Sequence, residues 1–207
     1  MQSGFTSLRP LYDFLRSNPD PKGLERGSPV RRGYGLTAKR ICAEIAPAQG
    51  FYLWGRYENN GLWQNIYLGK AGFGKTAHLR ARILEELKDE RVCIWRAFVS
   101  EETLVKAGEK NHGTMWRIYQ SHMTRSLKKT GTTHIAWVAD PDHLEDAAVK
   151  NIESDLIETL NPRANISRPV PPVSLQKHTK EIIAEFRSLI HAHRDERFEV
   201  PTLKQTR

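Results

Sequence analysis

Residues 50–69 decide the fold: they read GFYLWGRY at 50–57, ENNG at 58–61 and LWQNIYLG at 62–69. Two runs rich in aromatic and aliphatic residues flank a segment that contains Asn-Gly, which is typical of a β-hairpin. Further along the chain, HIAWVA at 134–139 has the length and composition of another short strand. Sequential strands joined by a tight turn predict an antiparallel arrangement.

Helices are predicted after this hairpin in the sequence order. Apolar residues recur at helical spacing in 77–87, in 142–160 and near 179–191, while RVCIWRAFV at 91–99 reads as a strand. We therefore predict an α+β fold, with a small antiparallel or mixed sheet that starts with the hairpin and is flanked by helices.

Composition changes along the chain indicate three parts. Residues 1–47 are basic and rich in proline and glycine, so we expect an arm or a partly ordered extension. The central domain is expected at 48–168, with a helical insertion at about 100–130. Residues 169–207 are expected to form a C-terminal helical extension.

The net charge of +8 is informative because of its distribution: of the segments compared, only residues 131–170 carry a net negative charge. A basic body with one acidic stretch is typical of a protein that binds a polyanion and also holds a cation. The longest uninterrupted apolar run, 135–139, is far too short to span a membrane. Two cysteines do not make a disulfide framework. We expect a soluble intracellular protein.

The hairpin brings two tyrosines near each other. If all of ENNG forms the loop, Tyr52 lies opposite Tyr67, and if only Asn60 and Gly61 form the turn, the two tyrosines are diagonal neighbours. Either register leaves both phenols on one face because side chains alternate with a period of two, whereas a three-residue or bulged turn would separate them. An aromatic pair that merely packs the sheet is the alternative interpretation.

Several short motifs together resemble a known family. GFY at 50–52 and YLG at 67–69 resemble the paired motifs of the GIY-YIG nuclease superfamily, and Lys70 with Ala71 continues that likeness. IESDLIETLNPRAN at 152–165 is similar to the family's glutamate-bearing helix, which is followed by Asn or Gln, Pro, two residues and Asn. The resemblance covers the central domain. The turn after YLG is longer than the family's.

The resemblance implies hydrolysis of DNA phosphodiester bonds with a divalent cation, Mg²⁺ or Mn²⁺. Glu153 would be the metal ligand, since a carboxylate is a hard oxygen donor suited to Mg²⁺. An arginine would stabilise charge on the phosphorane, and we expect Arg80 rather than Arg82. Asn165 would orient the metal site or the substrate.

A tyrosine would take the proton from the attacking water. A phenol with a pKa of ~10 is a poor base at neutral pH, and a neighbouring ammonium group lowers that pKa. Lys70 is close to Tyr67 in sequence, so Lys70 is expected to assist. The base is either Tyr67 or Tyr52, with the other tyrosine hydrogen-bonding the phosphate or the water.

The expected partner is DNA, double-stranded, with a restriction-type or mobile-element role favoured by chain size, and a homodimer would allow both strands to be cut. Two alternatives stay open. GKAGFGKT at 69–76 matches the nucleotide-binding loop of P-loop NTPases, in which Lys75 would contact phosphate. The chain could also be a DNA-binding module without catalysis.

Overall fold

The computed structural model describes residues 1–19, 27–73, 77–88, 127, 130–139, 146–165 and 176–200. Within them, a four-stranded antiparallel sheet has the order β1-β4-β2-β3. The strands are β1 (Gln2–Ser7), β2 (Gly50–Tyr57), β3 (Trp63–Ala71) and β4 (His134–Ala139). The helices are α1 (Arg9–Ser17), α2 (Pro29–Ile41), α3 (Leu79–Leu87), α7 (Asp146–Leu160) and α8 (Lys177–Ala192), with the short 3₁₀ helices η2 (Cys42–Glu44) and η4 (Arg194–Glu196).

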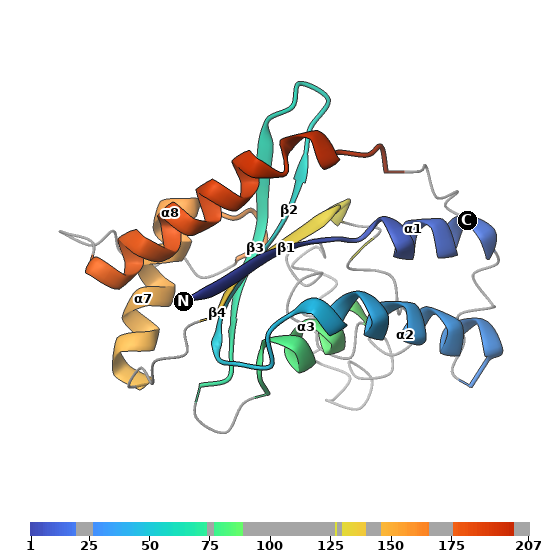
Figure 1. Cartoon of the computed structure of the whole chain (residues 1–207), viewed down its shortest axis with the longest axis horizontal. Helices are drawn as coiled ribbons and strands as arrows, with labels where there is room; N and C mark the ends of the chain where they lie inside the picture. The colour runs from blue at the N-terminus through green and yellow to red at the C-terminus, as the bar shows by residue number, and fades with distance from the viewer. Residues whose placement is uncertain are drawn as a thin grey trace, which may run out of the picture.

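The α+β architecture and the antiparallel hairpin are confirmed. Helices cover both faces of the sheet (Figure 1). One face, which we call the α3 face, packs against α1, α2 and α3 through a core that includes Trp54, Ile135 and Trp137. The other, the α7 face, packs against α7 and α8 through a core that includes Leu53 and Val138. Strictly alternating side chains along β2 and β4 supply both cores.

The hairpin register differs from both predicted forms near its turn. The Glu58 amide donates to the Leu62 carbonyl, which leaves a three-residue loop that ends with Gly61 at φ +76°. A β-bulge then shifts the register between Trp54 and Gly55. The loop and the bulge each change the pairing by one residue, and the two changes cancel further down the hairpin.

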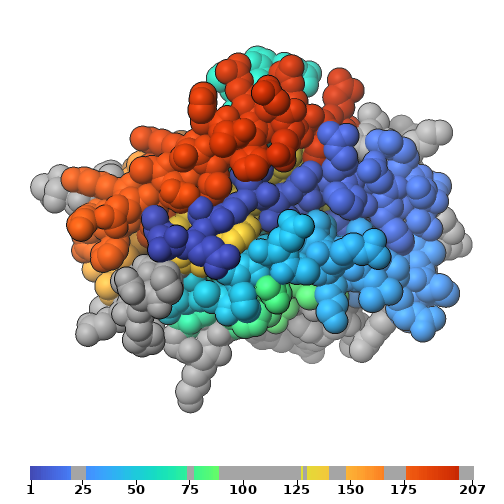
Figure 2. All heavy atoms as spheres, in the orientation of Figure 1, coloured from blue at the N-terminus to red at the C-terminus, as the bar shows by residue number. Residues whose placement is uncertain are grey.

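The expectation that the N-terminal residues form an arm is wrong. β1 pairs with β4 along its whole length, from Gln2 opposite Ala139 to Ser7 opposite His134. The following helices α1 and α2 bury Leu11, Tyr12 and Tyr34 in the core of the α3 face. In the space-filling view β1 lies at the surface between α8 and α2, as the edge strand of the sheet on this side (Figure 2). The boundary at residue 47 stays a prediction.

Several predicted elements lie outside the described residues. These are the strand at 91–99, most of the helical insertion at about 100–130 and the proline-rich segment that leads into the C-terminal extension. α8 falls where the C-terminal helix is predicted. No helix in the described part of the chain is long and apolar enough to cross a membrane.

Candidate functional site

The hairpin brings the two predicted tyrosines to the same face. Tyr52 pairs with Gly69 and Trp54 with Tyr67, so Tyr52 and Tyr67 are diagonal neighbours on the α3 face. Their ring centroids are 6.2 Å apart with an interplanar angle of 58°. A Cβ atom at Gly69 would clash with the Tyr52 ring, which explains the need for glycine at the end of YLG. The shared face of the two tyrosines is confirmed, although a three-residue loop was expected to place them on opposite faces.

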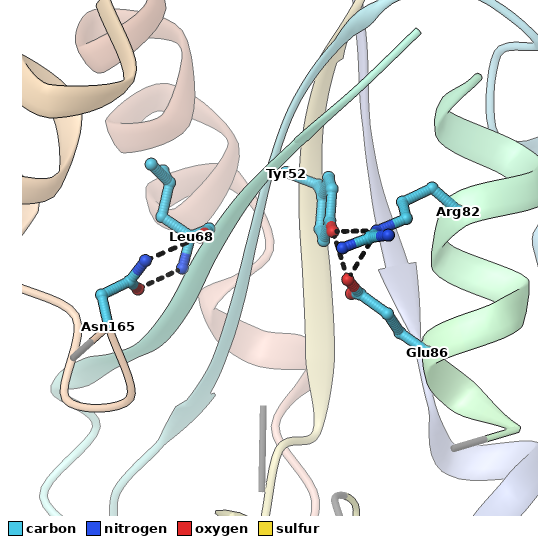
Figure 3. Close-up of polar contacts among 5 residues, drawn as sticks. All are labelled: Tyr52, Leu68, Arg82, Glu86 and Asn165. Atoms are coloured by element: carbon cyan, nitrogen blue, oxygen red, sulfur yellow. Dashed lines mark hydrogen bonds and ion pairs between the residues drawn. The ribbon is translucent and has the colours of Figure 1, made fainter. Parts of the chain in front are cut away.

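Tyr52 lies at the centre of a buried polar network. Its hydroxyl donates to Oε1 of Glu86 at 2.6 Å, and the same oxygen accepts from Nε of Arg82 at 2.9 Å (Figure 3). Tyr52 is 0% exposed and Glu86 is 1% exposed. Burial raises the pKa of Tyr52 well above its usual value of 10, and the Glu86 carboxylate raises it further. Tyr52 therefore acts as a hydrogen-bond donor that holds the sheet to α3.

Of the two candidate arginines, Arg82 is the one that faces the tyrosines. Nε of Arg82 lies 3.4 Å from the Tyr52 hydroxyl, whereas Nε of Arg80 donates to the Ile45 carbonyl at 2.8 Å. Residues two apart on a helix point about 200° apart, so only one of the pair can face the sheet. Arg82 is therefore better placed than the expected Arg80 to act together with the tyrosines.

Glu86 is the residue that sequence reasoning missed. It follows Arg82 by four residues, which is one helical turn and the spacing of a favourable ion pair. A carboxylate at the end of an apolar helical stripe reads as a solvated charge, yet here it is enclosed between α3 and the sheet. The i, i+4 spacing was the available signal.

The other half of the predicted site lies on the opposite face. Nζ of Lys70 is 2.8 Å from Oε2 of Glu153, and the two side chains are 29% and 27% exposed. α7 positions Glu153 because Ile152 and Leu156 bury its apolar side against the α7 face. The pair therefore stands at a rim, accessible to solvent and to a ligand.

The expected proximity of Lys70 to the Tyr67 phenol is wrong. Three residues separate them along a strand, so alternation directs their side chains to opposite faces. Tyr67 packs against the core of the α3 face, while Lys70 pairs with Glu153 on α7. The site residues predicted as one cluster are thus divided between the two faces of the sheet.

Asn165 forms hydrogen bonds that the sequence did not predict. Its Nδ2 donates to the Leu68 carbonyl and its Oδ1 accepts from the Leu68 amide, both at 2.9 Å (Figure 3). This paired geometry completes the hydrogen bonding of β3, which is an edge strand of the sheet. Asn165 fixes the loop after α7 to the hairpin, and both ends of its amide are occupied by that contact.

The donor set for a divalent cation is small. No group of three or more His, Cys, Asp or Glu side chains suited to a metal occurs among the described residues. Mg²⁺ keeps several waters and binds through one or two carboxylates together with substrate phosphates. The part-exposed carboxylate of Glu153 fits a cation that arrives with a phosphate group.

The segment that matches a phosphate-binding loop begins as a strand. Gly69, Lys70 and Ala71 pair with residues of β2, so their backbone belongs to the sheet ladder. The strand pairings in the described part of the chain are antiparallel, whereas a P-loop follows a strand of a buried parallel sheet. Lys75 and Thr76 lie outside the described residues.

Comparisons with protein-family models, with curated proteins and with solved structures each give no significant match. The likeness to GIY-YIG nucleases therefore rests on the motifs quoted above and stays a prediction.

Proposed function

We propose that the protein is a metal-dependent endonuclease that hydrolyses DNA phosphodiester bonds. The observation that carries the proposal is the part-exposed pair of Lys70 and Glu153, whose charged atoms are 2.8 Å apart at the rim of the α7 face. A metal-bound phosphate offers a cation and anionic oxygens. The carboxylate can bind the cation, and the ammonium group beside it can bind the oxygens. The net charge of +8 suits a polyanionic substrate.

In this proposal Glu153 would hold Mg²⁺ or Mn²⁺, and Lys70 would contact a phosphate oxygen of the substrate. When bound, the cation would polarise the phosphate and lower the pKa of a coordinated water. Asn165 positions the loop beside β3 and so supports the site without touching the substrate.

The tyrosines divide into two roles. Tyr52 is buried, donates to Glu86 and has a raised pKa, so it is poorly suited to accept a proton from water. Tyr67 is partly buried on the edge strand and is the better candidate of the two tyrosines for the base, but its phenol lies on the opposite face of the sheet from Glu153, so a substrate held at Glu153 would reach it only around the edge strand. Arg82, which is held by Glu86, takes the place that the sequence assigned to Arg80.

The alternatives predict different behaviour. A P-loop NTPase would bind ATP through Lys75, but an antiparallel edge strand leads into this segment, which argues against that reading. A DNA-binding module without catalysis would bind duplex DNA in a salt-sensitive way and would not cut it with any metal. The proposal includes a role in restriction or in a mobile element. It also includes a homodimer that would cut both strands.

The test is cleavage of long supercoiled and linear DNA of mixed sequence with Mg²⁺ or Mn²⁺. Glu153→Ala should abolish cleavage, while Glu158→Ala, which removes another carboxylate from α7, should cut as the wild-type chain does. Discrete fragments would indicate sequence-specific cutting, and a smear would indicate loose cutting. Binding without cleavage by the wild-type chain would contradict the proposal and favour the non-catalytic module.

A further inference from the structure

A cleft of 390 Å³ lies where the tip of the hairpin meets the ends of α7 and α8. Figure 1 shows this tip projecting beside the C-terminal part of α8. Its apolar walls come from the three elements: Leu62 and Trp63 from the hairpin, Leu160 from α7 and Ile190 from α8. Leu62 is 66% exposed, which is unusual for a large aliphatic side chain. The volume falls within the range of about 300–1,000 Å³ for small-molecule sites.

Most polar groups in these walls are already used by the protein. Asn65 accepts from Nε1 of Trp63 at 2.7 Å and donates to the Leu160 carbonyl at 2.6 Å. The Tyr57 hydroxyl donates to the Ile190 carbonyl. These bonds fix the shape of the cleft and leave its apolar surfaces toward a ligand.

The remaining polar side chains are mainly cationic. Arg187 and His191 from α8 and Arg194 from η4 line the cleft, and their side chains form no hydrogen bond or ion pair within the described part of the chain. A Cβ atom at Gly61 would lie 3.6 Å from Nη2 of Arg194 and 3.5 Å from Nη1 of Arg197, so both guanidinium groups stand over the hairpin turn. Asp195 lines the adjoining hollow with the same arginines.

The cleft and the Lys70–Glu153 pair share the α7 face. Leu160 follows Glu153 by seven residues on α7, which corresponds to about 10 Å along the helix axis. Consecutive phosphates of one strand are separated by several ångströms, so a DNA strand that reaches Glu153 can extend into the cleft within a few nucleotides.

We propose that this cleft holds an unpaired nucleotide of the DNA substrate, with the base against Leu62 and Trp63 and the phosphate at Arg187 and Arg194. Exposed arginines without an acidic partner are available to an anion, the apolar walls beside them suit a flat apolar group, and a nucleotide supplies both. A base stacked inside a duplex cannot enter a concave site, so the ligand is unpaired. That the ligand is DNA rests on the proposed function, and the cleft adds where on the protein an unpaired nucleotide is held.

The test measures binding by fluorescence anisotropy in EDTA, so that it is independent of cleavage. The probes are a flush duplex and the same duplex with a short single-stranded overhang. The wild-type chain should bind the overhang duplex more tightly. The Arg187→Ala, Arg194→Ala double variant should weaken that binding about tenfold or more and lower the salt dependence by about two charges.

Two further variants separate the cleft from general surface charge. The Arg32→Ala, Arg40→Ala double variant removes two exposed arginines from α2 and should leave the overhang preference intact. Leu62→Ser should abolish the preference while binding of the flush duplex is unchanged, because no charge is altered. All five substituted positions are exposed on the folded chain, so folding is expected to be retained.

A cross-linking experiment locates the base directly. An overhang that carries 5-iodouracil should cross-link to the peptide that contains residues 57–65. Equal affinity of the wild-type chain for both duplexes, equal losses in the α8 and α2 variants, or cross-links confined to other peptides would each overturn the cleft. If the wild-type chain binds neither duplex, the cleft proposal also fails, and the cleavage assay still decides the proposed function separately.

Discussion

The two faces of the sheet carry the same kinds of residue in opposite environments. On the α3 face, Arg82 and Glu86 form an ion pair whose side chains are 15% and 0% exposed, and the Tyr52 hydroxyl joins it. On the α7 face, Lys70 and Glu153 form a pair that is 29% and 27% exposed. The first pair is enclosed between a helix and the sheet, while the second stands at a rim. Residue type alone therefore does not separate an enclosed network from an accessible one.

The solvent accessibility of the two ion pairs therefore distinguishes their expected roles. A buried charge pair is costly to desolvate and is strongly destabilising when one partner is lost. A part-exposed pair contributes little to stability and keeps its charges available to a ligand. Substitutions of Tyr52 or Glu86 should act on folding, and substitutions at the rim of the α7 face should act on chemistry.

The largest effect on stability is expected from Glu86→Ala. Its removal takes the carboxylate from Arg82, whose side chain is only 15% exposed, and the hydrogen-bond acceptor from the buried Tyr52. The free energy of unfolding should fall by about 3–5 kcal/mol, as for other broken buried pairs. Urea unfolding followed by circular dichroism measures it, with Glu158→Ala as the part-exposed control. A loss below about 1 kcal/mol would show that the network does not hold α3 to the sheet.

A second prediction uses pH, because the α7 face buries His134, which is 0% exposed. Burial lowers the pKa of His134 from 6.5 to about 4, although the Glu196 carboxylate acts in the opposite direction. The unfolded chain takes up this proton first as the pH falls, so the stability from neutral His134 is fully present above pH 6.5. It is then lost progressively down to about pH 4.

The expected loss between pH 7 and pH 4 is at most about 3 kcal/mol, since one pKa unit corresponds to about 1.4 kcal/mol. Urea titrations at several pH values measure it. His134→Phe, which keeps a ring beside Phe5, should flatten the slope in this window. If the variant keeps the full slope, the titrating group is not His134.

A smaller effect is expected from Asn165→Ala. The substitution removes two hydrogen bonds to Leu68 on the edge strand, which should lower the free energy of unfolding by about 1–2 kcal/mol. Cleavage per folded molecule should change less than the folded fraction does, because Asn165 acts through the loop. A complete loss of cleavage in a fully folded variant would return Asn165 to the reactive site.

The smallest change in stability is expected from Lys70→Ala. Part-exposed ion pairs contribute about 0–1 kcal/mol, and salt screens them. The free energy of unfolding should therefore stay within about 1 kcal/mol of the wild-type value at low and at high salt. A larger loss would mean that the Lys70–Glu153 pair is structural, and the contrast between the faces would disappear.

The antiparallel hairpin was predictable because strand patterning and Asn-Gly are local signals. The contribution of β1 was not, since Ser3 and Gly4 carry no apolar alternation and the strand is defined by its pairing with β4. The division of the site between two faces follows from strand alternation and could have been read from positions 67 and 70. Tyr52 and Tyr67 share a face only because the register shift of the bulge cancels that of the three-residue loop. No local sequence pattern specifies this pair of shifts.

DNA cleavage is expected to depend on the accessible carboxylate of Glu153 and not on the buried phenol of Tyr52. The most direct measurement compares the DNA cleavage rate per folded molecule of Glu153→Gln and Tyr52→Phe with that of the wild-type chain. The account predicts that Glu153→Gln loses about 100-fold or more, while Tyr52→Phe stays within about threefold, well short of the roughly 100-fold cost of losing a general base. A folded Tyr52→Phe variant that no longer cuts, or a Glu153→Gln variant that cuts normally, would contradict the account.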